Sequence, residues 1–453
     1  MAIKGILYVY ILIVASVSLV SYKKGIYVVW LTLLLTPLVV LQTGIKMRLS
    51  LMTILLLGSV ISELRFRERR TDWMSFISSN QKAIILYLTI SFSIVFFSQT
   101  VPIGYQLRRV FDEIVMLLFA LQTFLLFRDD DGNRHTTVFM RIICGVLLFN
   151  FAYFVFFELI MGINPAGLPL YMFMGVDDNE NLVDMIEVER GAMSFRAQTV
   201  YGHPLSLGQY MLAFLPLFIV KKQLRFRMVY ILIICVLVVM TGTRGAMAPM
   251  FLIIILGINR LISNVLPKIV LLLIAIVLTI SFIPDRQWRH FSKSVEPFVA
   301  SIQFWDDKKQ YANDIGGSSM EMRFSQFDAA LKETSANPLF GRGYGYREYW
   351  QKKHNGLHPD LLGYESLLIY YLVERGWIGL FLFFAMAFFL YRLFRNNTLE
   401  IIAIKLIFIA YLLSIIMTGV RHLTFLFVCL ASSIVCGTFS KSNSVDKCIT
   451  SNA

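Results

Sequence analysis

Charged residues are scarce in this chain of 453 residues. Only 16% of them are Asp, Glu, Lys or Arg, whereas about 25% is usual in soluble proteins. Hydrophobic residues make up 57% of the chain, which exceeds the roughly 45–50% of a soluble domain. This composition argues against a soluble protein and indicates one that crosses a membrane several times.

Cysteine pairs and nucleotide-binding motifs are also lacking. The five cysteines form no CxxC pair and no metal-ligand spacing, so we expect neither a disulfide framework nor a zinc site. The sequence has no GxxxxGK[ST] loop and no GxGxxG segment after a strand, which removes the usual signs of nucleotide binding. No paired carboxylates on the predicted outer side of the membrane have convincing metal-ligand spacing, so we expect chemistry without a metal or another cofactor.

Acidic residues are outnumbered by basic ones, 29 against 42, and the net charge is +13. In a soluble protein such an excess would suggest nucleic acid as a partner. Here most of the excess lies in short connections between apolar runs, where positive charge orients membrane helices. We therefore expect the lipid bilayer, and no nucleic acid, as a partner.

Long apolar runs dominate the chain. Two-residue alternation of apolar and polar side chains is absent, which favours helices over a β-barrel. The first run is interpreted as a retained span rather than a cleaved signal peptide. The sequence thus predicts an all-α polytopic membrane protein with about twelve or thirteen transmembrane helices, in a single integral membrane domain. The runs cover residues 4–20, 25–43, 47–63, 83–99, 110–127, 138–160, 201–220, 228–241, 245–259, 266–283, 363–391, 399–417 and 421–438.

The basic residues predict which side of the membrane each connection faces. Alternate connections, beginning with the one at Lys23, carry most of the Lys and Arg of the short connections. By the positive-inside rule these connections are cytoplasmic. Two long segments, 161–200 and 284–362, are then periplasmic. The second is predicted to be a large, partly helical loop with a helix over 321–333.

Arg244 is the most informative basic residue on the predicted outer side. It lies in the tight turn 241–245 between two uncharged apolar runs. An arginine at mid-bilayer depth costs roughly 2.5–3.5 kcal/mol on insertion scales, and guanidinium groups suit phosphate. We therefore expect Arg244 to bind an anion at the membrane surface; the alternative is that it reaches lipid headgroups or caps a helix C-terminus. The same two interpretations apply to other basic residues of that side: Arg196, His203, Arg421 and His422.

Two groups before the eleventh run are candidates for a general base. Glu365 begins an apolar span, where a carboxylate is either favoured by the helix dipole or positioned to take a proton. His358 lies in the polar approach to the same helix, although a loop histidine is usually solvated. The adjacent pair Glu374 and Arg375 interrupts the next apolar stretch, and we interpret it as structural.

Four short segments follow one another in the second half of the chain. They are Tyr201–Gly208 with its Gly-His-Pro sequence, the turn Thr241–Ala246, the segment from Arg323 to Gly345, and Glu365–Leu380. Together they resemble the ordered motifs of the O-antigen ligase/polymerase superfamily of bacterial envelope glycosyltransferases. The resembling region runs from about residue 195 to residue 385, somewhat under half of the chain.

The resemblance implies a helical, C-type glycosyltransferase-like fold. Members of this superfamily move glycans carried on undecaprenyl pyrophosphate at the outer face of the bacterial inner membrane. By resemblance, Arg244 and Arg323 would contact the pyrophosphate or a nearby sugar. Many members, the ligases especially, have His-Asn at the start of the last motif, where this chain has Tyr364-Glu365-Ser366. Glu365 is therefore the favoured base and His358 the second choice.

These expectations combine into a multi-pass enzyme of the bacterial inner membrane with its active site facing the periplasm. We expect an O-antigen polymerase that transfers the growing glycan from undecaprenyl pyrophosphate to a lipid-linked repeat unit. Arg342 and Tyr344 of the large loop are expected to contact the glycan. An O-antigen ligase acting on lipid A-core is the alternative within this class, and a lipid-linked glycan flippase is the alternative from another class. A chain-length regulator in the membrane is a further candidate partner.

Overall fold

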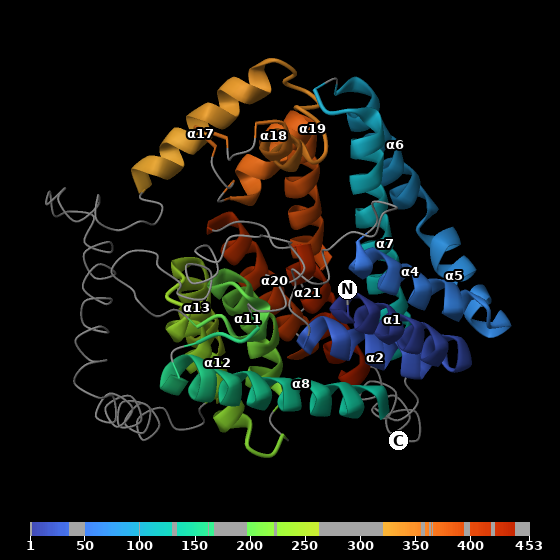
Figure 1. Cartoon of the computed structure of the whole chain (residues 1–453), viewed down its shortest axis with the longest axis vertical. Helices are drawn as coiled ribbons and strands as arrows, with labels where there is room; N and C mark the ends of the chain where they lie inside the picture. The colour runs from blue at the N-terminus through green and yellow to red at the C-terminus, as the bar shows by residue number, and fades with distance from the viewer. Residues whose placement is uncertain are drawn as a thin grey trace, which may run out of the picture.

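The computed structural model of the chain is a bundle of helices (Figure 1). Its described residues contain α-helices with short 3-10 and π-helical segments and no β-strand. The predicted class, an all-α polytopic membrane protein, is confirmed. The described residues are 2–35, 50–98, 100–128, 134–161, 163–166, 197–221, 224–261, 320–354, 358–361, 364, 366–393, 399–417 and 422–439.

The apolar helices occupy the predicted runs in order. Each predicted run contains a helix, except 266–283, which lies outside the described residues. The helices are α1 (Ala2–Val20), α2 (Tyr22–Leu35), α4 (Leu51–Leu64), α6 (Gln81–Phe97), α7 (Ile103–Arg128), α8 (Arg134–Tyr153) with the π-helix η1 (Phe154–Met161), the 3-10 turn η2 (Thr199–Tyr201), α11 (Pro204–Val220), α12 (Arg227–Met240), α13 (Arg244–Leu261), α19 (Leu367–Leu393), α20 (Leu399–Met417) and α21 (His422–Phe439).

Three helices in the described part of the chain are long and apolar enough to cross a membrane individually. They are Ile103–Arg128, Arg134–Met161 and Leu367–Ala385. A fourth arises if α5 (Arg67–Ser79) and α6, which are bent by 75° relative to one another, count as one broken span. Other apolar helices, such as α11 and α12, are shorter. The total of twelve or thirteen spans therefore stays a prediction.

The segment between α4 and α6 differs from the expectation. The sequence predicts a polar cytoplasmic connection there, but residues 67–79 form helix α5. This helix buries Arg69 and Trp73 and leaves most of its other side chains exposed. Because it has no apolar run, hydropathy alone does not reveal it.

Helix α11 lies inside the bundle. All of its residues except Leu205 are buried, as expected for a helix that is apolar on every side. It packs against α12, α13, α20 and α21. The ring of Tyr210 lies 4.3 Å from that of Phe427 in α21, centroid to centroid.

Two further helices, α17 (Met320–Ser335) and α18 (Tyr346–His354), lie at one end of the bundle. Figure 1 shows them beside the start of α19 and far from α8. The helix predicted over 321–333 is present as α17. We call α17, α18 and the segment 336–345 between them the outer layer.

Candidate active site at three helix N-termini

The N-terminal ends of α11, α13 and α21 lie beside one another. Gly208 of α11 packs so closely on α13 that an added Cβ would lie 2.7 Å from the Cβ of Ala246 and 3.0 Å from Oγ1 of Thr243. Oγ1 of Thr424 in α21 donates to Oε1 of Gln209, at 2.9 Å. Helix N-termini carry unpaired N–H groups and the positive end of the helix dipole, so three of them together favour an anion.

Hydroxyl groups shape the turn between α12 and α13. Oγ1 of Thr241 donates to the carbonyl of Val238 at 2.7 Å and lies 2.7 Å from Oγ1 of Thr243. Gly242 has a φ of 59°, a left-handed conformation that glycine adopts without steric cost. Helix α13 then begins at Arg244. The backbone of Arg244 therefore lies at the N-terminus beside α11, while its side chain is outside the described part of the structure.

His203 caps helix α11. Its Nδ1 accepts the backbone N–H of Leu205 at 3.1 Å, and Pro204 follows as the first helical residue. A side-chain acceptor at this position satisfies an N–H group that has no partner within the helix. The capping alternative from the sequence is at a helix C-terminus, whereas His203 caps the N-terminus of α11.

Thr199 precedes this helix in a left-handed conformation with a φ of 48°, which is strained for a β-branched residue. Its Oγ1 donates to Oδ1 of Asn150 at 2.7 Å. Its N–H donates to Oε1 of Glu158 at 2.7 Å, and its carbonyl accepts from Nδ2 of Asn164 at 3.1 Å. All four residues are buried. Side chains of α8, η1 and residue 164 therefore fix the turn that leads into α11.

A second set of contacts joins the outer layer to α19. The N–H of Arg342 donates to the carbonyl of Val373 at 2.7 Å, and the N–H of Gly343 donates to that of Glu374 at 3.0 Å. Helix α19 is interrupted at Gly376, which has a φ of 62° and a ψ of −161°. This interruption lets the N–H of Trp377 donate to the carbonyl of Pro338 at 2.9 Å. Two of the resembling motifs therefore bind each other through their backbones.

The pair Glu374 and Arg375 lies inside this junction. The Glu374 carboxylate accepts the N–H groups of Gly345 at 2.8 Å and of Arg347 at 3.3 Å. Nη2 of Arg375 donates to Oε1 of Glu113 in α7. The Arg375 guanidinium also lies 4.6 Å from the ring centroid of Tyr344 and 4.4 Å from that of Tyr371. These contacts agree with the structural interpretation of the pair.

The carboxylate of Glu333 in α17 contacts three side chains, two of which the sequence predicts as site residues. Its Oε2 lies 3.0 Å from Nη2 of Arg342 and accepts the hydroxyl of Tyr346 at 3.1 Å. Its Oε1 lies 3.6 Å from Nε2 of His358. Arg342 and His358 are thus brought together by one carboxylate, although they are sixteen positions apart in the sequence.

The hydrogen bonds of His358 determine which ring nitrogen carries the proton. Nδ1 accepts the backbone N–H groups of Asp360 at 3.3 Å and of Leu361 at 3.2 Å. Because Nδ1 accepts, the proton of the neutral ring is on Nε2, which faces Glu333. In this arrangement the acceptor nitrogen of the His358 ring is occupied by backbone N–H groups.

Burial changes the acidity of three tyrosines around the outer layer. It raises the pKa of Tyr344 to about 12, against the opposing charge of Arg375. Burial first, and Glu333 next, raise the pKa of Tyr346, and burial also raises the pKa of Tyr364. These phenols stay protonated near neutral pH. Tyr344 is only 2% exposed, so stacking on a sugar would require its ring to be uncovered first.

Several predicted site residues fall outside the described structure. Glu365, Arg196 and Arg421 are outside the described residues, and so are the side chains of Arg323 and His422. The backbones of Arg323 and His422 lie in the first turns of α17 and α21. Among the described residues, no group of three His, Cys, Asp or Glu could hold a metal ion.

Sequence reasoning missed the contacts of Glu158 and Thr199. A usable signal exists for Glu158, because a carboxylate within an apolar run such as 138–160 is rare and often functional. No local signal exists for Thr199. Its conformation is set by residues 35 to 49 positions away in the sequence.

Residues 229–384 match the sequence model of a family described as O-antigen ligase. The matched segment contains the turn with Arg244, the outer layer and α19 as far as Phe384. The resemblance to the O-antigen ligase/polymerase superfamily is confirmed. A comparison with curated proteins finds no match. The family match supports a function of the O-antigen ligase/polymerase type with glycosyltransferase-like activity. Together with the apolar helices it indicates a multi-pass membrane protein.

Proposed function

We propose that this protein is an O-antigen polymerase of the bacterial inner membrane. It would transfer the growing glycan from undecaprenyl pyrophosphate to a lipid-linked repeat unit at the periplasmic face. The observation that carries the proposal is the meeting of the N-termini of α11, α13 and α21, at which Arg244 begins α13. Three helix dipoles and an arginine suit the pyrophosphate of a lipid carrier.

The reaction needs two forms of assistance. The acceptor hydroxyl oxygen attacks the anomeric carbon of the growing glycan, and the bond from that carbon to the pyrophosphate oxygen breaks. Undecaprenyl pyrophosphate leaves with the bonding electron pair, and Arg244 with the helix N-termini stabilises its charge. The hydroxyl proton passes to a base. Glu365 is proposed for this role, because the acceptor nitrogen of His358 is already occupied by backbone N–H groups.

The outer layer would then hold the two glycans above the site. A backbone hydrogen bond from Gly343 to Glu374 attaches this part of the outer layer to α19. Within the outer layer, Arg342 is the basic side chain that the sequence predicts to contact glycan. Its ion pair with Glu333 at 3.0 Å sets where the guanidinium group is presented.

The proposal is tested in cells that lack the endogenous gene and carry Arg244→Ala or the matched control Arg225→Ala. Arg225 is an exposed arginine near the start of α12, at the opposite end of that helix from Arg244. Lipopolysaccharide with a single repeat unit in the Arg244→Ala strain, and a full ladder in the control strain, would support the polymerase. A full ladder from well-expressed Arg244→Ala would exclude the proposed role.

The ligase remains the second candidate, because the matching family is described as O-antigen ligase. The same strains separate the two enzymes. A lost ligase leaves bare core, with polymer still attached to the lipid carrier, whereas a lost polymerase leaves core with one repeat unit. The flippase alternative predicts that purified protein moves lipid-linked glycan across a liposome bilayer without lengthening it.

A further inference from the structure

Helix α5 does not run in the same direction as α6, the apolar helix that follows it. It follows α4 after Arg65 and Phe66, and it is bent by 75° from α6 at Asn80. Figure 1 shows it at the edge of the molecule. Because α5 is polar and bends away where the apolar helix α6 begins, it is suited to lie along the membrane surface rather than to cross it.

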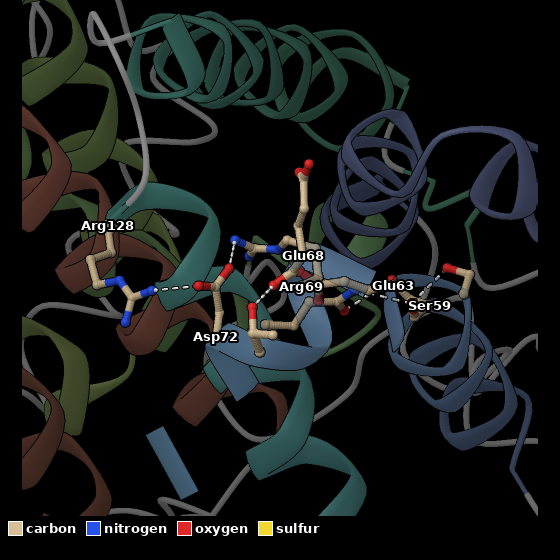
Figure 2. A network of polar contacts seen from close by, with 9 residues as sticks. Ser59, Glu63, Glu68, Arg69, Asp72 and Arg128 are labelled. Carbon is tan, nitrogen blue, oxygen red and sulfur yellow. Dashed lines mark hydrogen bonds and ion pairs between the residues drawn. The ribbon is translucent and has the colours of Figure 1, made fainter. Parts of the chain in front are cut away.

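A network of charged side chains fixes the inner face of α5 (Figure 2). Nε of Arg69 donates to Oε1 of Glu63 in α4 at 2.6 Å, and Nη1 of Arg69 donates to Oδ2 of Asp72 at 3.1 Å. Asp72 also pairs with Arg128, the last residue of α7, with 3.5 Å between Oδ1 of Asp72 and Nη2 of Arg128. Arg69 is only 5% exposed, and its guanidinium lies 5.4 Å from the ring centroid of Tyr22. The sequence predicts a polar cytoplasmic connection at Arg69. In the structure its side chain is buried and attaches α5 to α4.

The anchoring determines which residues face outward. Arg67, Arg70, Met74 and Ile77 follow the spacing i, i+3, i+7, i+10 and therefore share one side of the helix. All four are exposed, Met74 by 67% and Ile77 by 39%. No carboxylate shares this side, because Glu68 belongs to another face and points away from the network in Figure 2. We call these four residues the outward face of α5.

We propose that the outward face of α5 binds anionic phospholipid headgroups of the leaflet that borders this end of the bundle. Met74 and Ile77 enter the boundary between headgroups and acyl chains, and Arg67 and Arg70 contact headgroup phosphates. The two apolar side chains suit a bilayer, which is always present beside a spanning protein, better than they suit water. The positive-inside prediction puts this face on the cytoplasmic leaflet, where anionic lipids are concentrated.

The full chain is tested in nanodiscs of phosphatidylcholine that contain a minor fraction of spin-labelled phosphatidylglycerol. The protein should retain phosphatidylglycerol in preference to equally labelled phosphatidylcholine. The double variant R67Q/R70Q should lose this preference. The matched variant R134Q/R225Q removes two exposed arginines outside α5 and should keep it. An equal preference in both double variants would overturn the proposal.

A second measurement leaves the arginines intact. A nitroxide attached through M74C, in a background without other cysteines, should be relaxed more by oxygen than by a water-soluble nickel complex. The reverse order would overturn the proposal, because the outward face would then lie in water. Absence of any lipid preference in the unaltered protein would also overturn it, and would direct attention to an acidic protein as the partner of this face.

Discussion

Arg375 in α19 forms an ion pair with Glu113 in α7, and this pair joins the segment before the break in α19 to the neighbouring long helix. The side chain of Arg375 is only 10% exposed and that of Glu113 only 21%. Aromatic rings of Tyr344 and Tyr371 cover the guanidinium. The ion pair therefore links the outer layer, α7 and α19 in one unit.

Replacing Arg375 with methionine should destabilise the protein by about 3 kcal/mol, because it leaves the largely buried Glu113 carboxylate without its charged partner. The midpoint of thermal unfolding in detergent measures the effect. The double variant Glu113→Leu, Arg375→Met should regain most of the loss, since two apolar side chains leave no unpaired charge. A double variant as unstable as the single one would contradict this account of the pair.

Gly341 and Gly376 should not tolerate alanine. Both have positive φ values, and a Cβ on Gly341 would lie 2.6 Å from the backbone N of Gly376. We expect each variant to lose roughly 1–2 kcal/mol from the backbone conformation alone, with a further loss from the clash. Gly104→Ala is the control, because nothing lies within 4 Å of its added Cβ. A stability of Gly341→Ala equal to that of Gly104→Ala would be evidence against the close junction.

Glu158→Ala should shorten or abolish the polysaccharide ladder. The carboxylate accepts N–H groups of Gln198 and Thr199 and the side chain of Asn164, and each buried donor left unpaired costs about 1–3 kcal/mol. The turn before α11 would then lose its fixed geometry. Phe156→Ala, at a side chain that is 60% exposed, serves as the control in the same helix. Normal ladders from Glu158→Ala would show that this turn does not position the site.

The two candidate bases give different expectations. Glu365→Gln should lower the rate of glycan lengthening by roughly 10²–10⁴-fold, the usual contribution of a general base. His358→Gln should act mainly on stability, since the ring binds backbone N–H groups and faces Glu333. The rate at which purified protein lengthens lipid-linked glycan distinguishes them. A larger rate loss in His358→Gln than in Glu365→Gln would reverse the assignment.

Local patterns in the sequence predict part of this structure. Apolar runs locate α11, α12 and α13, and the Gly-Thr-Arg-Gly sequence locates the turn before Arg244, because both signals depend only on neighbouring residues. Helix α5 is not predicted from the sequence, because the face that it buries includes the charged Arg69 and has no apolar stripe. The burial of Tyr344 is not predicted either, because its partner Arg375 lies 31 positions later in the sequence. The strained Thr199 depends in the same way on distant side chains.

The most direct test of the central claim uses purified protein with lipid-linked repeat units as the substrate. The protein should convert them into longer lipid-linked glycans, and Arg244→Ala should abolish this lengthening, while Arg225→Ala retains it. Chain length is read by gel electrophoresis of the released glycans. Unchanged lengthening by a folded Arg244→Ala protein would contradict the claim that the N-termini of α11, α13 and α21 form the pyrophosphate site.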